Sequence, residues 1–233
     1  MARGDGSAGD GSRGEVHRRV QRSLDAQYRA RAEEVERFLR AGIDVIRRTD
    51  SIDPRITDII ERSGLSNKAF YRHFSSKDDL LVAILRDGLQ HTVDELTARM
   101  AALPTPDEKV RAWIEGTLSR SQWPHGIANT RPFILMGYRL AHDFPDEWRE
   151  TDRRARAPLV DAVAEGRRDG TFPDADPERD AEAIYHLTMG KLHASTIWCV
   201  VPSDDEVDAL VTFALAGLRH GRRRRRRAAR RTR

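Results

Sequence analysis

Residues 62–81 of this 233-residue chain, RSGLSNKAFYRHFSSKDDLL, hold the side chains best suited to chemistry. From Arg62 to Lys77 there is no carboxylate, although 33% of all residues are charged. Asn and Lys side chains at the start of a short helix can pair with base edges, and cations can neutralise phosphates. The segment therefore predicts contact with nucleic acid. The same residues also fit an exposed polar helix turn with no ligand.

Short helices are predicted to position this segment. Helical apolar spacing indicates a first helix from about residue 32 to 48. Asp53-Pro54 predicts the start of a second helix, capped by Asp53, that ends near Gly64. Ser66 is expected to cap a third helix over about 67–74, and Ser75-Ser76 a longer one that reaches about residue 100.

The remainder of the chain is also predicted to be helical, which makes the fold class all-α. Capping boxes at residues 105–108 and 203–206 and an Asp-Pro pair at 176–177 each predict a helix start. Residues 123–126 are expected to break a helix, and Pro132 to begin a short one. A pattern over 148–169 is interrupted at Pro158, and no stretch shows the two-residue period of a strand.

Composition excludes several classes of protein. The single cysteine, Cys199, rules out a disulfide scaffold and favours a reducing cytoplasm. No apolar run reaches the roughly 18 residues of a membrane span, and the Gly-, Asp- and Arg-rich start has no secretory signal. The eight histidines lack ligand spacing, and no phosphate loop or catalytic elbow occurs. We therefore expect no metal, no cofactor and no enzyme.

The positive charge is concentrated at the end of the chain. Residues 222–233 contain nine arginines and no acid, and without them the formal net charge of +4 becomes −5. A run of this kind is expected to be disordered and to attract polyanions without sequence preference. Recognition of a particular base sequence would depend on the acid-free segment, residues 62–77, instead.

The run YRHFSSKDDL at residues 71–80, preceded by short helices and a glycine turn, resembles the tetracycline-repressor (TetR/AcrR) family of bacterial regulators. The resemblance covers about residues 32–85, and beyond residue 90 only the general layout agrees. Pro54-Arg55 depart from the threonines that usually begin the family's second helix. The resemblance implies a helix-turn-helix DNA-binding domain over 30–77 and a helical ligand-binding and dimerisation domain over 78–220. Residues 1–29 would be a disordered or partly helical extension, and 221–233 a disordered tail.

The resemblance also implies which residues contact DNA. Those opening the recognition helix would meet bases, and an alanine methyl can contact a thymine methyl. Later ones would bind phosphate, although Tyr71 could instead be core and His73 structural. The predicted set is Arg55, Thr57, Ser66, Asn67, Lys68, Ala69, Tyr71, Arg72, His73 and Lys77.

In the C-terminal helices, apolar and aromatic side chains could surround an inducer, or simply form the bundle core. These candidates are Trp113, Phe133, Met136, Tyr138, Tyr185, Met189, His193 and Trp198. The last two helices would form the dimer interface, unless their apolar side chains are buried within one chain. That seam is predicted to contain Val207, Leu210, Val211, Ala214 and Leu218.

These features together predict a ligand-released homodimeric repressor of double-stranded operator DNA. The alternative is an activator or a nucleoid-type nucleic-acid binder that depends on the arginine tail. The sequence leaves three classes of effector open: an acyl thioester, an aromatic molecule, or an anionic compound that faces His125, Arg131 and Arg139.

Overall fold

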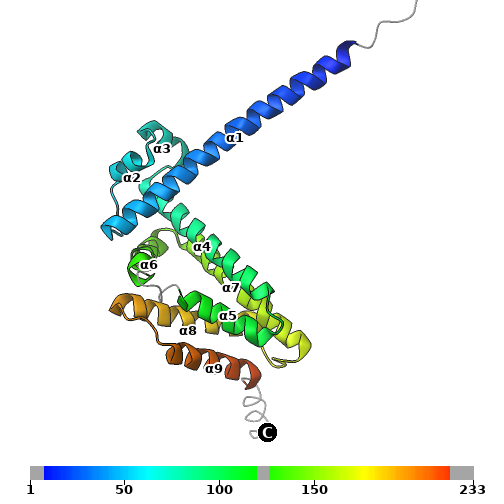
Figure 1. The fold of residues 1–233 in the computed structure, drawn as a ribbon, viewed down its shortest axis with the longest axis vertical. Helices are drawn as coiled ribbons and strands as arrows, with labels where there is room; N and C mark the ends of the chain where they lie inside the picture. Colours follow the sequence, from blue (N-terminus) through cyan, green and yellow to red (C-terminus); the bar gives the residue numbers. More distant parts are fainter. Residues whose placement is uncertain (1–7, 120–125, 221–233) are drawn as a thin grey trace, which may run out of the picture. The chain divides into compact units, whose positions relative to one another are not determined.

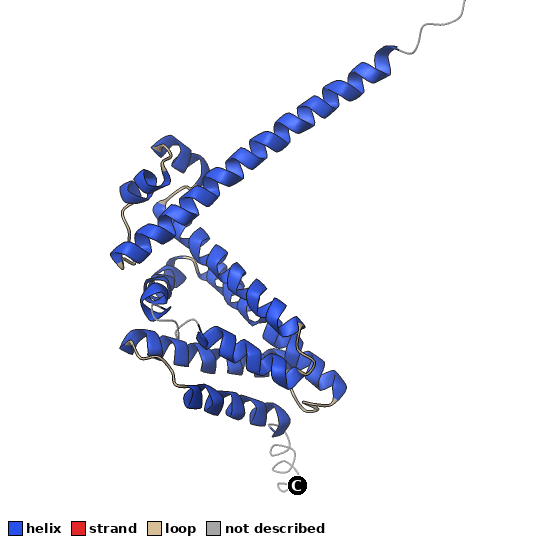
Figure 2. Ribbon diagram, in the orientation of Figure 1, coloured by secondary structure: helices blue, strands red, loops and turns tan. Residues whose placement is uncertain are grey.

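The computed structural model describes residues 8–119 and 126–220, and these form helices and connecting loops without a strand, which confirms the all-α prediction (Figure 2). The helices, drawn in Figure 1, are α1 (Ala8–Thr49), α2 (Ile56–Ser63), α3 (Asn67–His73), α4 (Lys77–Ala101), α5 (Pro106–Ser119), α6 (Gly126–Asp143), α7 (Pro145–Asp169), α8 (Pro177–Trp198) and α9 (Asp204–His220). The chain divides into two compact units. The first contains residues 1–45 and 54–80, and the second contains residues 46–53 and 81–233.

Aromatic side chains form the core of the first unit. Phe38 of α1 lies edge-on against Phe70 and Phe74, with ring centroids 5.4 and 6.0 Å apart. Ile59 of α2 and Leu80 of α4 are fully buried with them. Four helical segments thus share one small core, which fixes α3 against α1 and α2.

Helix α1 begins much earlier than the predicted residue 32. It is helical from Ala8, and the side chains of residues 21–33 are all exposed, including Leu24 and Tyr28. The extension is therefore a continuation of α1, and over residues 21–33 it turns its side chains to solvent. Residues 221–233, which include the arginine tail, lie outside the described residues.

Most predicted helix starts are confirmed by cap hydrogen bonds. Ser66 Oγ accepts from Ala69 N at 3.1 Å, Ser76 Oγ from Asp79 N at 3.1 Å, and Asp176 Oδ1 from Arg179 N at 3.4 Å. The boxes at 105–108 and 203–206 form reciprocally. The prediction for Asp53 was wrong: α2 begins at Ile56, and the N-cap is Arg55, whose side chain makes no cap bond.

The second unit is built around α5, which packs against α7, α8 and α9. Trp113, Ile114 and Leu118 of α5 are essentially inaccessible to solvent, and Leu159 of α7 and Val211 of α9 close over them. Helix α6 packs on α7 and α8. This arrangement supplies the large core that a helical domain of this size needs.

Two prolines predicted to limit helices lie inside them instead. Pro132 is internal to α6, which begins at Gly126, and Pro158 is internal to α7. The predicted break at 123–126 otherwise falls on residues outside those described. Each proline removes one backbone hydrogen bond, but both are buried, and the packing of the helices outweighs that loss.

Candidate nucleic-acid interface

The turn between α2 and α3 is fixed by backbone geometry and by one arginine. Gly64 has φ +64°, a left-handed conformation that glycine adopts without strain. Arg37 of α1 donates through Nη2 to the carbonyl oxygens of Ser63 at 2.8 Å and Gly64 at 3.3 Å. The turn is thereby tied to α1, and the direction of α3 is set.

The first turn of α3 presents two polar side chains to solvent. Asn67 and Lys68 are exposed, and Ser66 uses its hydroxyl in the cap. Ala69 is only 5% exposed and belongs to the core, so its methyl group is not available to a base as the sequence had suggested. An amide and an ammonium group at this position can pair with adenine and guanine edges.

Two of the predicted phosphate contacts are engaged by an acid of α1. Glu34 accepts from Arg72 Nη2 at 2.7 and 2.9 Å, and it lies 2.6 Å from His73 Nε2. Hydrogen bonding to His73, and then to Arg72, lowers the pKa of the Glu34 carboxyl group. The His73 side chain is 9% exposed, which favours the structural role left open for it, whereas Arg72 remains 47% exposed.

The other predicted contacts lie at helix starts or on the exposed face. Tyr71 is 58% exposed, with its ring edge-on to Phe70. Arg55 is 82% exposed and pairs through Nε with Asp58 at 3.1 Å, while Thr57 Oγ1 lies 3.3 Å from the same carboxylate. Lys77 is the first residue of α4. The first unit therefore carries cations just before α2, on α3 and at the start of α4.

Sequence reasoning missed Glu34 and Arg37. Both lie on α1, and their partners are 26 to 39 residues further along the chain. Nothing in the local pattern distinguishes them from the other charged residues of α1. Their roles follow only from the packing of α1 against α3.

The predicted ligand candidates do not surround a single space. Tyr138 of α6 hydrogen bonds to Nδ1 of His193 on α8, and burial lowers the pKa of His193. Trp113 lies 6.0 Å from Tyr185, and burial, followed by a hydrogen bond to Asp152, strongly raises the pKa of the Tyr185 hydroxyl.

The remaining candidates are scattered. Met136 is fully buried, Met189 packs on the core, and Trp198 is 73% exposed at the end of α8. The ring of Phe133 lies 5.8 Å from the Arg47 guanidinium. These placements favour the simple core reading for Trp113, Met136 and Met189.

The arginines expected to face an anionic effector already have acidic neighbours. Arg131 Nη1 lies 2.9 Å from Asp50, and Arg139 Nη2 lies 4.0 Å from Asp53. His125 is outside the described residues.

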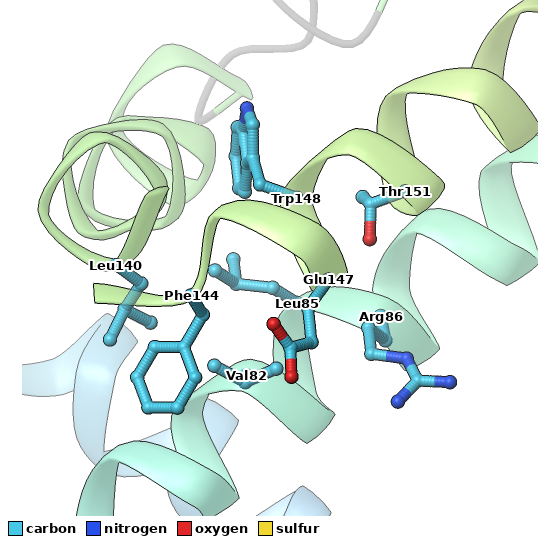
Figure 3. Close-up of a pocket in the computed structure, with 8 residues that line it drawn as sticks. All are labelled: Val82, Leu85, Arg86, Leu140, Phe144, Glu147, Trp148 and Thr151. Atoms are coloured by element: carbon cyan, nitrogen blue, oxygen red, sulfur yellow. The ribbon is translucent and has the colours of Figure 1, made fainter. Parts of the chain in front are cut away.

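A hollow does occur between α4, α6 and α7, and none of the predicted candidates lines it (Figure 3). Its lining consists of Val82, Leu85, Arg86, Leu140, Phe144, Glu147, Trp148 and Thr151. Phe144 is the N-cap of α7 and Trp148 lies in the first turn of that helix.

The predicted dimer seam is buried inside the chain. Val207, Val211, Ala214 and Leu218 are at most 7% exposed, and Leu210 packs on the same core. Burial within one chain, the alternative reading, is therefore favoured for these four residues, whereas Leu210 is only partly buried. Large apolar side chains do remain exposed on α8 and α9, namely Leu187, Ile197, Trp198 and Phe213.

Within residues 8–119 and 126–220, no helix combines the length and apolar character that crossing a bilayer requires. The same residues contain no group of three His, Cys, Asp or Glu side chains placed to hold a metal ion.

Comparisons of sequence place these features among known proteins. A family model described as "Bacterial regulatory proteins, tetR family" matches residues 55–84. YvdT of Bacillus subtilis, an uncharacterised HTH-type transcriptional regulator, is 37% identical over 65 residues, which cover 28% of this chain and 34% of that protein. The repressor KstR2 of Mycolicibacterium smegmatis is 25% identical over 145 residues, covering 61% and 68% respectively. The chain thus spans about a third of YvdT and about two thirds of KstR2.

Solved structures share the fold over most of the chain. FadR of Bacillus subtilis in complex with stearoyl-CoA has a TM-score of 0.60 at 17% identity, covering 80% of this chain and 98% of that one. A regulator of Saccharomonospora viridis in complex with choline has a TM-score of 0.62 at 21% identity, covering 81% and 97%.

Proposed function

We propose that the chain is a member of the tetR family of bacterial regulatory proteins and that it is a homodimeric repressor that a small molecule releases from operator DNA. The match of the family model and the similarity to YvdT support a role as a transcriptional regulator. The observation that carries the proposal is the exposed, acid-free first turn of α3, capped by Ser66 and oriented by the Gly64 turn. In helix-turn-helix proteins this turn meets base edges in the major groove.

The proposed contacts divide into two kinds. Asn67 and Lys68 read bases, because they are the exposed hydrogen-bonding side chains of that turn. Arg55, Tyr71, Arg72 and Lys77 position the unit on phosphates. Such contacts fix the register without carrying sequence information.

The proposed dimer uses the exposed apolar face of α8 and α9. Leu187, Ile197, Trp198 and Phe213 are between 45% and 73% exposed. Large exposed apolar patches usually mark interaction sites. Two copies related by a twofold axis would bury this face. The dimer would then carry two DNA-binding units, called reading heads below, which suit half-sites about one helical turn or more apart.

Release would occur by a shift between two dimer states. A ligand that binds the second unit favours the state whose reading heads are wrongly spaced, and DNA affinity falls by the difference in ligand affinity between the states. Helix α4 connects the units, because residues 77–80 belong to the first and 81–101 to the second. Choline and stearoyl-CoA bound to structural neighbours support a small-molecule effector. We place this activity in the cytoplasm, without a cofactor or an enzymatic step.

The test is binding to the DNA just upstream of the gene for this chain, at two salt concentrations and with excess unrelated duplex. We expect saturable binding that survives the competitor, with two protected half-sites. Binding that disappears with the competitor would overturn the repressor proposal.

Deletion of residues 222–233 distinguishes the proposed repressor from the alternative, a nucleoid-type binder that depends on the arginine tail. A repressor that recognises the operator through α3 keeps its preference for that DNA, although its overall affinity falls because arginines are lost. A nucleoid-type binder led by the tail loses nearly all binding.

A further inference from the structure

A carboxylate from α1 lies against the end of α3. Glu34 accepts from Arg72 Nη2 through both of its carboxylate oxygens, at 2.9 and 2.7 Å, and its Oε2 lies 2.6 Å from His73 Nε2. The Glu34 side chain is 27% exposed, and its pKa is lowered, first of all by the hydrogen bond with His73. The group is therefore an anion at neutral pH that solvent still reaches.

Arg72 belongs to the surface that is proposed to meet DNA. It lies one turn after Lys68 on α3, and both side chains are exposed. Asn67 and Tyr71 are exposed as well, and positions i, i+1, i+4 and i+5 of a helix share one face. Glu34 therefore places a negative charge beside a face that is otherwise made of polar and cationic side chains.

Glu34 uses one nitrogen of Arg72 and leaves the others open. Both hydrogen bonds start from Nη2, and within the described residues Nε and Nη1 make none. Because a guanidinium group is planar, holding Nη2 also restricts the directions in which the other N–H groups point. Arg72 can therefore donate to a phosphate through Nε or Nη1 while Glu34 occupies Nη2.

This ion pair acts differently on the two kinds of DNA complex. On unrelated DNA a protein samples many registers, which are held by phosphate contacts alone. In most of them a phosphate near Arg72 would also lie near the Glu34 carboxylate, and like charges repel. On an operator, base contacts hold a single register, in which a phosphate can meet the N–H groups that Glu34 leaves open. The carboxylate therefore costs more affinity on unrelated DNA than on the operator.

We propose that Glu34 is a positioning residue for operator recognition, which acts through Arg72 to lower binding to unrelated DNA. The inference rests on the proposed function, in which α3 recognises an operator. Glu34 contacts no base. It restricts the direction of the Arg72 guanidinium and makes the phosphate contact of that arginine depend on register. This adds to the selectivity that Asn67 and Lys68 supply through base contacts.

The experiment measures the affinity of the full chain for two duplexes of equal length over a salt series. One is the DNA just upstream of its gene, and the other is unrelated. In Glu34→Gln the amide keeps an oxygen acceptor but loses the charge. Affinity for the unrelated duplex should rise about two- to fivefold, and its dependence on log salt should steepen by about 0.9, because Arg72 becomes free to bind phosphate. Operator affinity should change little, so the ratio of the two affinities falls by about the same factor.

Two further comparisons locate the effect. Glu36→Gln removes the same charge from an exposed position of the same helix, and its affinity ratio should equal that of the original chain. Arg72→Gln removes the proposed partner, so adding Glu34→Gln to it should bring no further change on unrelated DNA. Arg72→Gln alone, at an exposed position, should also lower the ratio, because the contact that it removes is made mainly on the operator. Circular dichroism at the assay temperature checks that each variant is folded.

A ratio that falls in Glu34→Gln and Arg72→Gln but not in Glu36→Gln would support the inference. Affinity that falls equally on both duplexes in Glu34→Gln would overturn it, because that is the result expected from the loss of a purely structural ion pair. A preference for the operator that survives both substitutions unchanged would overturn this inference alone. An original chain without any preference would overturn the proposed function, and this inference with it.

Discussion

Lys68 and Lys77 carry the same charge but occupy different places. Lys68 is exposed on the first turn of α3, and Lys77 begins α4. We predict that Lys68→Ala costs about 1–3 kcal/mol at the operator but little on unrelated DNA. Lys77→Ala should weaken all DNA alike and reduce the slope of log affinity against log salt by about 0.9. Competition binding over a salt series measures both effects.

Arg149→Ala is the control for these two lysine variants, since Arg149 is 76% exposed on α7 and belongs to the second unit. Unchanged operator preference in Lys68→Ala would contradict the proposed docking of α3.

Glu34 joins α1 to the end of α3, and its lowered pKa makes that link depend on pH. Because the folded-state pKa lies below the ordinary value, the stabilisation is complete above that value. It is lost as the pH falls through the folded pKa. We therefore predict that Glu34→Gln lowers the Tm at pH 7 and that the difference shrinks between about pH 5 and pH 3.

Thermal unfolding over that pH range tests the effect, with the exposed Glu36→Gln on the same helix as control. A difference between the Glu34→Gln chain and the original that stays constant with pH would show that the carboxylate charge is not responsible.

At the scale of helices, what the sequence could predict was local. Ser66, Ser76 and the two capping boxes were identified correctly, because each cap bond joins groups no more than four residues apart. Asp53 was misassigned because Pro54 and Arg55 remain outside the helix, with Arg55 in an extended conformation. The continuation of α7 through Pro158 depends on packing in the second unit, which local propensity does not contain.

Helical glycines in this fold are not equivalent, and a pair of substitutions shows why. A Cβ atom on Gly166 of α7 would lie 2.2 Å from Cδ2 of Phe172, which is fully buried, whereas Gly88 of α4 has open space. We predict that Gly166→Ala destabilises the chain by about 1–3 kcal/mol through overpacking. Gly88→Ala should stabilise it by about 0.5–1 kcal/mol through helix propensity.

Urea unfolding monitored by circular dichroism gives both free energies. Loss of stability in Gly88→Ala would mean that its position on α4 is occupied, for example by a second chain.

The two ends of α1 should differ in local stability. Phe38, Val45 and Ile46 are buried, whereas the side chains of residues 21–33 are exposed. Isolated helical segments of that length are marginal in water. We predict that amides of residues 21–33 exchange much faster than those of 38–46, by a factor on the order of a hundred or more. Hydrogen exchange with peptide-level readout measures this, and equal protection would indicate that the extension is packed against a partner.

At the scale of the whole molecule, the sequence predicted that α9 has an apolar face, but it did not predict which partner that face packs against. The stripe on α9 fits a dimer seam and a chain core equally, because both require the same helical period. The structure buries Val211 and Ala214 within the chain, while Phe213 stays exposed, which favours the core interpretation for those two residues. The hollow could not be predicted, because Leu85, Leu140 and Trp148 are brought together from three helices.

The exposed face of α8 and α9 leads to a prediction about assembly. Phe213 is 67% exposed, and a second copy would bury its ring. Burying an aromatic side chain contributes about 1.5–3 kcal/mol, and two copies double the effect in a symmetric dimer. Phe213→Glu should therefore shift the dimer to the monomer at micromolar concentration. Because each half-site then binds alone, operator affinity should fall as well.

Sedimentation equilibrium measures the mass, with Ala157→Glu on the exposed face of α7 as a control of equal charge. A Phe213→Glu chain that stays dimeric would exclude this face as the interface. A monomer that still protects two half-sites with undiminished affinity would mean that the reading heads do not depend on each other, and the release mechanism through head spacing would fail.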